Sequence, residues 1–432
     1  MKNNPISELC TGCGMCATEL TSSLRMNWDQ KGFLVPEKIL DEDVSQAIKV
    51  CPFNSAPEAS VADEDKLSRI YLKDATLSDD RVGLYESIYV GYSNKYRLTS
   101  SSGGIATYVF EYLLKNNIVS SIFIVGEMEG GYGYKIISDV DQVKYISKTR
   151  YFPVTMVDVF NEIDKVSGNV AISGVACFLK AVRLKQYYNP HLKDKIPFLV
   201  GIICGGWKSK FFTDFLAQKS GLIGSYSHQE YRVKDKDSSA IDYSFSAVDL
   251  LGKKHSMKML SVGDMWGTGL FKSPACDFCS DVLTELADIS LGDAWLPDYR
   301  EDGSGNSIII ARSKLANDIL INGVYKEELT IRELDIESAV NSQYASFLHR
   351  RDALKFRIAI YNFFGKTVPH VRSRVLKNIS FPYMVVQICR MVTRKKSIDI
   401  WVEQNNARVF DKKMKLYLFM LKVATRIYHK FR

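Results

Sequence analysis

Three cysteines near the start of this 432-residue chain are separated by two residues each, and a fourth follows at a distance. These are Cys10, Cys13, Cys16 and Cys51. Gly12 and Gly14 lie within the triplet, and Pro52 directly follows the fourth cysteine. A cubane cluster needs four thiolates at tetrahedral corners, and a tight loop supplies only three of them. Small residues let such a loop wrap around the cluster, and a proline stiffens the fourth arm. The spacing predicts a 4Fe–4S site.

A structural zinc site is the alternative for this motif. Zinc usually takes two paired C-x2-C knuckles, which a triplet with a distant Cys-Pro does not match. Two-cluster ferredoxins have a further cysteine four residues after the third, and here that position is Leu20. We therefore expect residues 1–60 to form a small ferredoxin-like module with one cluster.

Four of the five remaining cysteines lie where a second site could form. Cys177 and Cys204 each follow a predicted buried strand, at the strand ends that line the ligand crevice of an open parallel sheet. Cys276 and Cys279 form a C-x-x-C in a turn-like stretch. Spacing alone leaves open a second tetrahedral ligand set or scattered thiols. Cys389 is expected to be an incidental thiol.

The pattern of apolar residues predicts the elements that would position these cysteines. Apolar side chains recur at helical spacing through residues 105–113, which predicts an amphipathic helix. Apolar runs at 121–125, 169–173 and 197–204 predict buried strands, and the last two lead into helix-compatible sequence. This alternation is typical of βαβ units in a parallel sheet.

Turn residues and composition divide the chain further. Glycines between 126 and 133, followed by strand-like sequence, predict a hairpin, and the polar stretch 55–80 is expected to be a linker. The predicted fold class is an α/β body with a mostly parallel sheet, preceded by the small iron–sulfur module and followed by a basic helical tail. The predicted boundaries are 1–60 for the module, 85–310 for the α/β domain, 311–370 for a helical C-terminal part of the body, and 371–432 for the tail.

A serine- and glycine-rich segment, LTSSSGG at 98–104, directly precedes the predicted helix. Bare backbone, hydroxyl groups and a helix N-terminus together make an anion site suited to the pyrophosphate of a dinucleotide. An ordinary helix N-cap with a flexible lead-in is the alternative, and the sequence leaves both open.

The net charge of +8 is distributed unevenly. Residues 371–432 contain fifteen Lys and Arg against three acids, which gives +12 and leaves −4 for the rest of the chain. Such a tail could bind anionic lipid or an acidic partner, or could pack on its own acidic body. Nucleic acid is not an expected partner, because the charge is not organised around a recognisable nucleic-acid-binding fold.

Neither an export signal at the N-terminus nor an apolar run long enough to span a membrane is present in the sequence. We therefore expect a cytoplasmic protein, peripheral at the inner face of the membrane if the tail binds lipid. In a reducing cytosol, spaced cysteines are expected to be metal or redox ligands before disulfides.

With these motifs in order, the chain resembles the beta subunits of hydrogenases and dehydrogenases that use the deazaflavin coenzyme F-420. Bacterial relatives of that family are often associated with surface-polysaccharide genes. The resemblance covers most of residues 1–310. It runs through CTGCGMC, SSSGGIATYVFEYL, SKTRYFPV, ISGVACFLKAVR, IICGGWKSKFF and CDFCSDVLTELADISLGDAW.

The resemblance implies two 4Fe–4S clusters and FAD as cofactors. The ligands that it implies for the second cluster are Cys177, Cys204, Cys276 and Cys279. It implies FAD phosphate contacts for Ser102, Gly103 and Gly104, flavin or substrate contacts for Lys148 and Arg150, and a cofactor-facing position for Asp293. A turn-forming Gly-Asp is the alternative for Asp293. Ala176 stands where the family usually has proline, and SKTRYF replaces the commoner Gly-Ser-Lys-Tyr form.

The function that the resemblance implies is that of a flavin-dependent iron–sulfur oxidoreductase. It would relay electrons between a two-electron donor or acceptor at FAD and the clusters, in the service of surface-polysaccharide biosynthesis. The partner would be a redox protein or a small-molecule substrate. The alternative is a non-catalytic, ferredoxin-like electron carrier without flavin. The sequence does not define the substrate, the direction of electron flow or the use of the deazaflavin.

Overall fold

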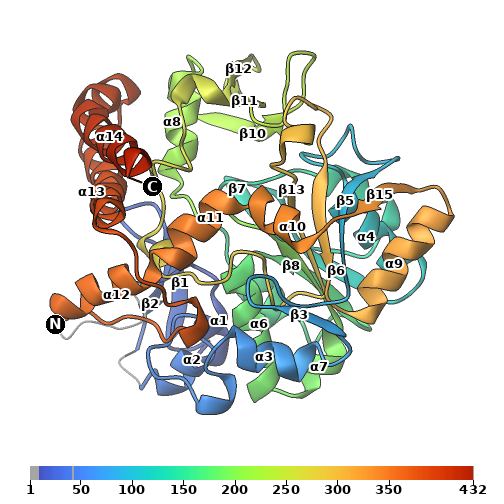
Figure 1. Cartoon of the computed structure of the whole chain (residues 1–432). Coiled ribbons are helices and arrows are strands. Elements are labelled where there is room, and N and C mark those ends of the chain that lie inside the picture. The colour runs from blue at the N-terminus through green and yellow to red at the C-terminus, as the bar shows by residue number, and fades with distance from the viewer. Residues whose placement is uncertain (1–8, 41–42, 432) are drawn as a thin grey trace.

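Runs of β-branched and aromatic residues form an eight-stranded sheet in the computed structural model, which describes residues 9–40 and 43–431 (Figure 1). The strand order is β15-β5-β14-β13-β9-β8-β6-β7. The strands are β5 (Ser87–Ser93), β6 (Ser121–Met128), β7 (Gly131–Ile137), β8 (Val170–Gly174), β9 (Phe198–Ile202), β13 (Ile289–Asp293), β14 (Ser307–Ala311) and β15 (Leu329–Glu333).

The centre of this sheet is parallel and its flanks are antiparallel. Strands β6, β8, β9 and β13 pair in parallel, and they include the three strands predicted from apolar runs. The glycine-rich turn joins β6 to β7 as the predicted hairpin. On the other flank, β14, β5 and β15 add antiparallel pairs, which makes the whole sheet mixed. The parallel strands at whose ends Cys177 and Cys204 were predicted to lie are therefore in the centre of the sheet.

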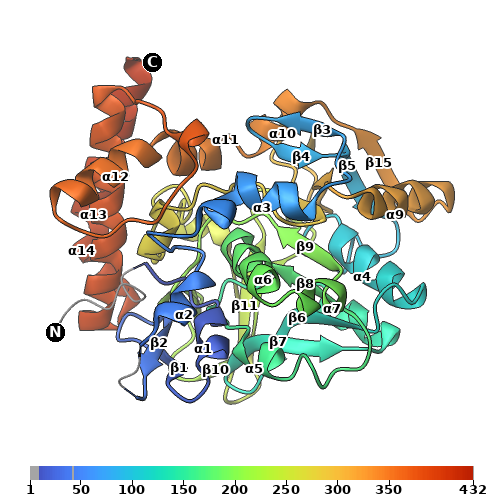
Figure 2. The same cartoon turned by 90° about the horizontal axis from the view of Figure 1, so that it is seen from below.

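Helices cover both faces of the sheet. On one face lie α6 (Ala176–Tyr188) and α7 (His191–Lys195), seen in front of the strands in Figure 2. The predicted helix α4 (Ile105–Lys115) and α9 (Lys314–Tyr325) pack on the other. Successive residues of β6 point to opposite faces, because Phe123 packs with Phe178 of α6 and Ile122 packs with Leu113 of α4.

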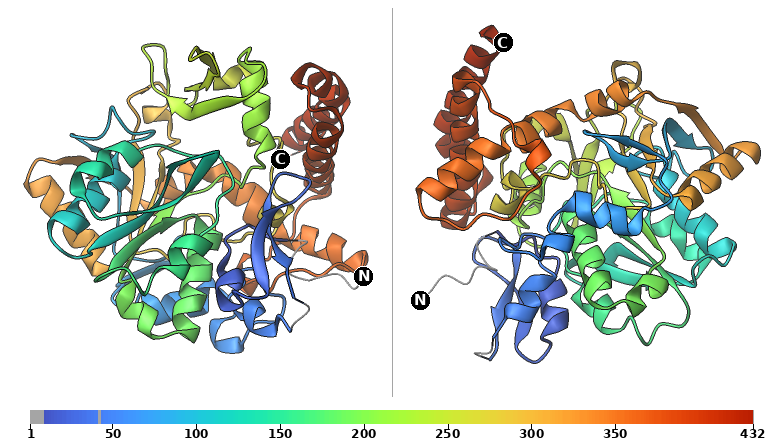
Figure 3. Two further views of the ribbon diagram at one scale, coloured as in Figure 1. Left: turned by 180° about the vertical axis from the view of Figure 1, so that it is seen from behind. Right: turned by 60° about the horizontal axis from the view of Figure 1, so that its bottom comes forward.

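The N-terminal segment is a small unit beside α6. It contains α1 (Met15–Glu19), α2 (Ser45–Lys49) and an antiparallel hairpin of β1 (Leu24–Trp28) and β2 (Leu34–Lys38). Figure 3 shows this unit beside α6 and below the C-terminal helices. Met15 and Val50 are almost fully buried in the same core cluster as Phe178, so the unit shares a core with the α/β body.

The polar stretch 55–80 is ordered, so its prediction as a linker is wrong. It forms η1 (Ala59–Val61), α3 (Glu64–Tyr71) and β3 (Leu77–Asp79), which pairs with β4 (Gly83–Tyr85). The side chain of Asp63 caps α3 by accepting hydrogen bonds from two backbone N–H groups. Glu64 and Lys180 form a buried ion pair at 3.2 Å. Polar residues are buried here because their partners come from distant parts of the chain.

The second half of the chain adds a further sheet and a helical hairpin. The second sheet is antiparallel, with strands β10 (Tyr226–Val233), β11 (Ser244–Asp249) and β12 (Lys254–Lys258). The connecting helices are α8 (Phe211–Lys219), α10 (Ile336–Ser342), α11 (Tyr344–Ser346) and α12 (Leu354–Phe363). The hairpin consists of α13 (Phe381–Gln404) and α14 (Ala407–Lys430), and it packs on α8 through aromatic rings such as Phe215 and Trp401.

A buried ion network joins the segment after residue 370 to the body. Arg372 is 1 % exposed, and its guanidinium lies 2.5 Å from the carboxylate of Glu285, which also pairs with Arg351 at 2.6 Å. Burial acts to raise the pKa of Glu285, but the two guanidinium groups hold it well below its usual value. Glu285 is therefore ionised in the core, and it depends on cations from two later segments.

Candidate redox site

The N-terminal cysteines lie on a tight loop and at the ends of two short helices. Cys10 and Cys13 precede α1, Cys16 lies on it, and Cys51 follows α2. Gly12 and Gly14 have φ values of 78° and 82°, in the left-handed region. A Cβ at Gly14 would clash with Oγ1 of Thr155. Glycine is therefore required at this turn, in agreement with the loop geometry predicted from the spacing.

The structure brings these four sulfurs into one buried group. Burial raises the pKa of each thiol, and the neighbouring cysteines of the set raise the pKa of Cys10, Cys13 and Cys16 further. The N–H of Gly12 donates a hydrogen bond of 3.3 Å to Sγ of Cys10. Thiolates at such positions need a positively charged centre between them. The donor set fits a cluster with four thiolate ligands.

The second cysteine set gathers at the carboxyl ends of two adjacent strands. Cys177 is the second residue of α6, directly after β8, and Cys204 follows β9. The two strands pair in parallel up to Gly174 and Gly201, so both cysteines emerge at the same edge of the sheet. Cys276 lies in η4 (Pro274–Asp277), and Cys279 follows it.

Shared contacts place these side chains near one another, because Cys177 and Cys279 line one cavity and Arg350 donates both to Cys279 and to the carbonyl oxygen of Cys204. Burial raises the pKa of Cys177, and the three other cysteines of the set raise it further. Burial also raises the pKa of Cys276 to about 12, and Cys204 adds to the shift. The sequence left a ligand set and scattered thiols open, and the structure brings the four together.

Hydrogen bonds to the second set come from the backbone and from an arginine. The N–H of Gly206 donates to Sγ of Cys204 at 3.3 Å, and the N–H of Trp207 donates to Sγ of Cys276 at 3.1 Å. Arg350 lies in η6 (Phe347–Asp352), and its Nη2 donates to Sγ of Cys279 at 2.7 Å. Sequence reasoning missed Arg350, because it is 71 residues from Cys279 and belongs to no motif.

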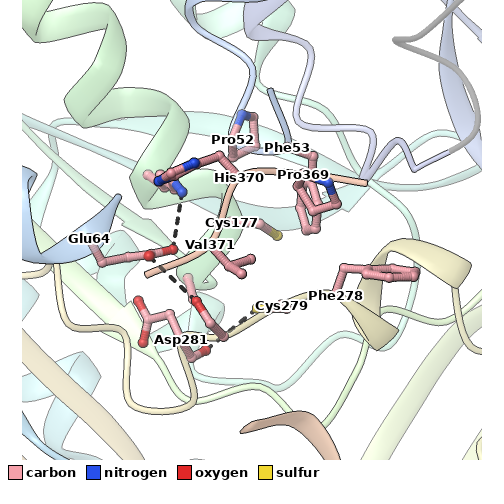
Figure 4. Close-up of a pocket in the computed structure, with 13 residues that line it drawn as sticks. Pro52, Phe53, Glu64, Cys177, Phe278, Cys279, Asp281, Pro369, His370 and Val371 are labelled. Atoms are coloured by element: carbon pink, nitrogen blue, oxygen red, sulfur yellow. Dashed lines mark hydrogen bonds and ion pairs between the residues drawn. The ribbon is translucent and has the colours of Figure 1, made fainter. Parts of the chain in front are cut away.

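A small cavity of about 20 Å³ lies beside Cys177 and Cys279 of the second set and is also lined by Pro52, the residue after Cys51. Figure 4 shows Cys177, Cys279 and Asp281 among its lining residues, with Pro52 and Phe53 of the N-terminal unit. Cys13 also contributes to the raised pKa of Cys177, and both cysteines raise the pKa of Tyr134. Cys13 of the N-terminal set therefore lies near Cys177 of the second set.

Within residues 9–40 and 43–431, no group of three or more His, Cys, Asp or Glu side chains has the spacing that holds a single metal ion. Ligands of one ion converge on one point, whereas the thiolates of a cubane cluster bind separate corners and stand further apart.

The predicted phosphate contacts lie between β5 and α4. Gly104 has a φ of 81° and is the N-cap of α4. The hydroxyl of Ser102 donates to the carbonyl oxygen of Asn306 at 3.1 Å, and the N–H of Gly103 donates to Oγ of Ser307 at 3.2 Å. These contacts hold the loop against β14. The polar groups of Ser102 and Gly103 that were expected to face phosphate therefore have protein partners in this structure.

Two basic residues missed by sequence reasoning line the same loop. Arg232 makes two hydrogen bonds to the carboxylate of Asp293, at 2.7 and 2.8 Å, and a third to the carbonyl oxygen of Ser101 at 3.1 Å. Nζ of Lys234 donates to the carbonyl oxygens of Arg97 and Ser102. Asp293 thus positions an arginine beside the loop, a role more specific than a turn. Arg232 is thus paired with a carboxylate, and Lys234 also donates to the carbonyl oxygen of Ser304, so this group has two cations and one acid beside the Ser-Gly loop.

Arg232, Lys234 and the Ser-Gly loop at 98–104 are called the cradle from here on, and Lys148 and Arg150 lie on a loop beside it. The N–H of Thr149 donates to Oγ of Ser101 at 2.9 Å, which joins the two loops. Lys148 lies 3.8 Å from Glu230 and lowers the pKa of Lys234, so it faces the cradle. The guanidinium of Arg150 is 4.9 Å from the centre of the Tyr132 ring, and its buried Nε has no hydrogen-bond partner among the described residues.

Tyr151 lies between the cradle and the second cysteine set. Burial raises the pKa of Tyr151. Arg232 lowers this pKa, whereas Asp293 and Cys204 raise it. Its ring is 4.7 Å from that of Trp266, and Trp266 is the nearest side chain to Gly205, the residue after Cys204. Tyr151 thus interacts electrostatically both with Arg232 and with Cys204 of the second cysteine set.

A sheet with four cysteines gathered at its strand ends, and a further four in the unit packed beside it, is an arrangement expected of a redox protein. Two family models, for the C-terminal and the N-terminal part of the coenzyme F420 hydrogenase/dehydrogenase beta subunit, match residues 167–337 and residues 88–161 respectively. The chain belongs to the coenzyme F420 hydrogenase/dehydrogenase beta-subunit family. The N-terminal cysteines, Arg350 and the hairpin lie outside both matched segments.

Two curated relatives and one solved structure show the extent of the likeness. The chain is 22 % identical to a coenzyme F420-dependent sulfite reductase of Methanocaldococcus jannaschii over 375 residues, which are 80 % of this chain and 53 % of the relative. It thus spans about half the length of that enzyme. It is 24 % identical to the coenzyme F420 hydrogenase subunit beta of Methanosarcina barkeri over 241 residues, or 51 % of this chain and 72 % of that subunit.

The solved structure is that of the F420-reducing nickel–iron hydrogenase complex of Methanosarcina barkeri. One of its chains superposes with a TM-score of 0.52 at 19 % identity, covering 68 % of this chain and 99 % of that one. This similarity shows a shared fold. Both relatives are oxidoreductases by name, which supports a redox enzyme.

Proposed function

We propose that this chain is an iron–sulfur flavoprotein that transfers electrons between FAD and two 4Fe–4S clusters. The observation that supports this most directly is the series from the Arg232 cradle through Tyr151 to Cys204, and from Cys177 to Cys13. Electron transfer needs such adjacent cofactor sites, whereas a structural metal site does not. Bound FAD would exchange two electrons at once with a donor or acceptor and single electrons with the clusters.

The residues of the chain have separate tasks in this proposal. Arg232 and Lys234 would bind the pyrophosphate, with the Ser-Gly loop held in place by Ser307. The eight cysteines of the two sets would bind the clusters. Hydrogen bonds from Gly12, Gly206 and Trp207 would offset negative charge on three of the sulfurs. The apolar and aromatic residues around these groups exclude water from them.

The electron donor or acceptor is a small molecule at the flavin or a redox partner protein. The names of the relatives make a reduced deazaflavin the first donor to test. A role in surface-polysaccharide biosynthesis, implied by the resemblance of the sequence, remains a prediction.

The test is to purify the chain without oxygen and to measure iron and released flavin per polypeptide. About eight irons and one FAD are expected. About four irons and no flavin would contradict the proposal and favour the electron carrier. Zinc in place of iron would contradict both. The protein would then be mixed with a reduced deazaflavin and, in a separate sample, with a reduced nicotinamide. The compound that bleaches the flavin absorbance identifies the donor class.

A further inference from the structure

The C-terminal hairpin has one face packed against the protein and one face turned outward. The inner face is apolar, because Phe410 and Met414 pack with Trp401, and Leu421 and Ala424 pack in a second cluster. Figures 1 and 3 show α13 and α14 at one edge of the molecule, outside the α/β body. The inner face therefore accounts for the fold of the hairpin, and the outer face is available for another partner.

Each helix of the hairpin has a row of exposed apolar side chains. On α14 they recur at spacings of seven, four and seven residues, which places them on one side of the helix. They are Val409, Leu416, Met420 and Ile427, with exposures of 36, 61, 49 and 46 %. On α13 the row consists of Phe381, Val385, Ile388 and Val392, with exposures of 76, 36, 47 and 40 %. Scattered apolar residues need no explanation, but two aligned rows indicate a contact surface.

A basic row lies beside the apolar row of α14. Successive residues turn by about 100° around a helix, which puts six cations next to the apolar side chains. They are Arg408, Lys412, Lys415, Lys422, Arg426 and Lys430. All six are exposed, and none forms an ion pair within the described part of the chain. The single acid of α14, Asp411, is paired with Lys219 at 2.6 Å.

We infer that the outer face of the α13–α14 hairpin binds the surface of an anionic membrane. An apolar row flanked by Lys and Arg is the pattern of a helix that lies in the bilayer interface, with the apolar side chains below the headgroups and the cations at the phosphates. None of the described helices is long and apolar enough to cross a bilayer, so the contact is with the surface.

The charges favour lipid over a second copy of this chain. An isologous contact between two hairpins would bring their basic rows together, and like charges at a contact oppose association. This inference does not depend on the proposed redox function, since the hairpin lies outside the cofactor series.

The test is flotation of the full-length holoprotein, purified without oxygen, with lipid vesicles. Vesicles of phosphatidylcholine alone are compared with an equal mixture of phosphatidylcholine and phosphatidylglycerol. The protein should float with the anionic vesicles and remain below with the neutral ones, and added salt should reduce the binding. Lys415→Glu, Lys422→Glu and Arg426→Glu together should weaken binding roughly a hundredfold.

A second variant tests the apolar row and has a matched control. Leu416→Glu with Met420→Glu should weaken binding more than about tenfold. Leu250→Glu with Leu251→Glu changes two residues that are 82 and 94 % exposed on the turn between β11 and β12, and it should bind like the wild type. Iron content and circular dichroism must match the wild type in each variant.

Two outcomes would overturn the inference. One is a wild type that fails to float with anionic vesicles. The other is a Leu416→Glu, Met420→Glu variant that floats as well as the control. A dimer in light scattering that this variant abolishes, without any flotation, would assign the face to a second copy of the chain.

Discussion

The guanidinium of Arg350 joins Cys279 to Cys204. Its Nη2 donates to Sγ of Cys279 at 2.7 Å, and its Nη1 donates to the carbonyl oxygen of Cys204 at 2.5 Å. Arg350 is 5 % exposed, so the charge acts in a poorly solvated environment. The nearby cysteines raise the pKa of Arg350 even though burial alone would lower it, and the side chain is therefore a permanent cation beside this set.

Replacing Arg350 should change the reduction potential of one cluster. A reduced cluster has one more negative charge, and Arg350 stabilises it, so Arg350→Gln should lower the midpoint potential by about 60 mV or more. A redox titration followed by electron paramagnetic resonance measures both clusters in one sample. The N-terminal cluster is the internal control and should not shift. Equal shifts of both, or no shift, would contradict this role for Arg350.

Removing one N-terminal cysteine should remove one cluster and leave the flavin. Cys16→Ser should lower the iron content from about eight to about four per chain and retain FAD, because Cys16 belongs to the N-terminal unit, which contributes no residue to the cradle. Cys389→Ser is the matched control, since Cys389 belongs to neither set and lies on α13. Loss of flavin together with iron in Cys16→Ser would show that the two sites do not form independently.

The cradle should bind FAD more tightly in mild acid than in mild base. Burial, followed by the charges of Arg232 and Arg97, lowers the pKa of Lys234 to about 7. Below that pH the amine is charged and attracts the pyrophosphate, whereas above it the amine is neutral. We expect the affinity of flavin-free protein for FAD to fall by about three- to tenfold from pH 6 to pH 8.5.

The Lys234→Arg variant tests whether Lys234, and no other titrating group, causes the pH dependence of FAD binding. A guanidinium stays charged throughout that pH range, so Lys234→Arg should bind FAD with little dependence on pH. The measurement is quenching of FAD fluorescence at each pH. An unchanged slope in Lys234→Arg would assign the pH dependence to another group.

The glycine between Cys13 and Met15 should be essential for the N-terminal unit. Gly14→Ala adds a clash with Thr155 to the strain of a left-handed backbone, and we expect it to destabilise that unit by more than about 3 kcal/mol. Gly221→Ala has the same kind of backbone, φ 88°, with no atom within 4 Å, and should cost only about 1 kcal/mol. Urea denaturation followed by circular dichroism and cluster absorbance compares the two, and similar midpoints would contradict the clash.

The sequence predicted those helices and strands whose own hydrophobic pattern is clear. The strands β6, β8 and β9 are continuous apolar runs, and α4 has a clear helical period, so each was found from sequence. The polar helix α3 was not found, because its burial depends on Lys180 and on arginines some 300 residues away. The antiparallel pairing of β5 with β14 was not predicted for a similar reason, since the two strands are more than 200 residues apart.

The same distinction holds for the site. The N-terminal ligand set follows from spacing within one loop, whereas the second set needed the sheet to bring its members together. No sequence motif contains Arg232, Lys234 or Arg350. Each of them contacts a residue that is distant in the sequence, so local spacing does not reveal its role. The adjacency of the two sets depends on how the N-terminal unit packs on α6, which no local pattern encodes.

The pairing of Arg372 with Glu285 has a consequence for the evolution of the chain. Glu285 is 2 % exposed and ionised, so a descendant that lost the segment after residue 370 would lose Arg372 and Arg374 and leave this buried carboxylate with Arg351 as its ion partner. Loss of the segment and neutralisation of position 285 should therefore be inherited together. Among natural sequences of this family, those that end early should have an uncharged residue at that position.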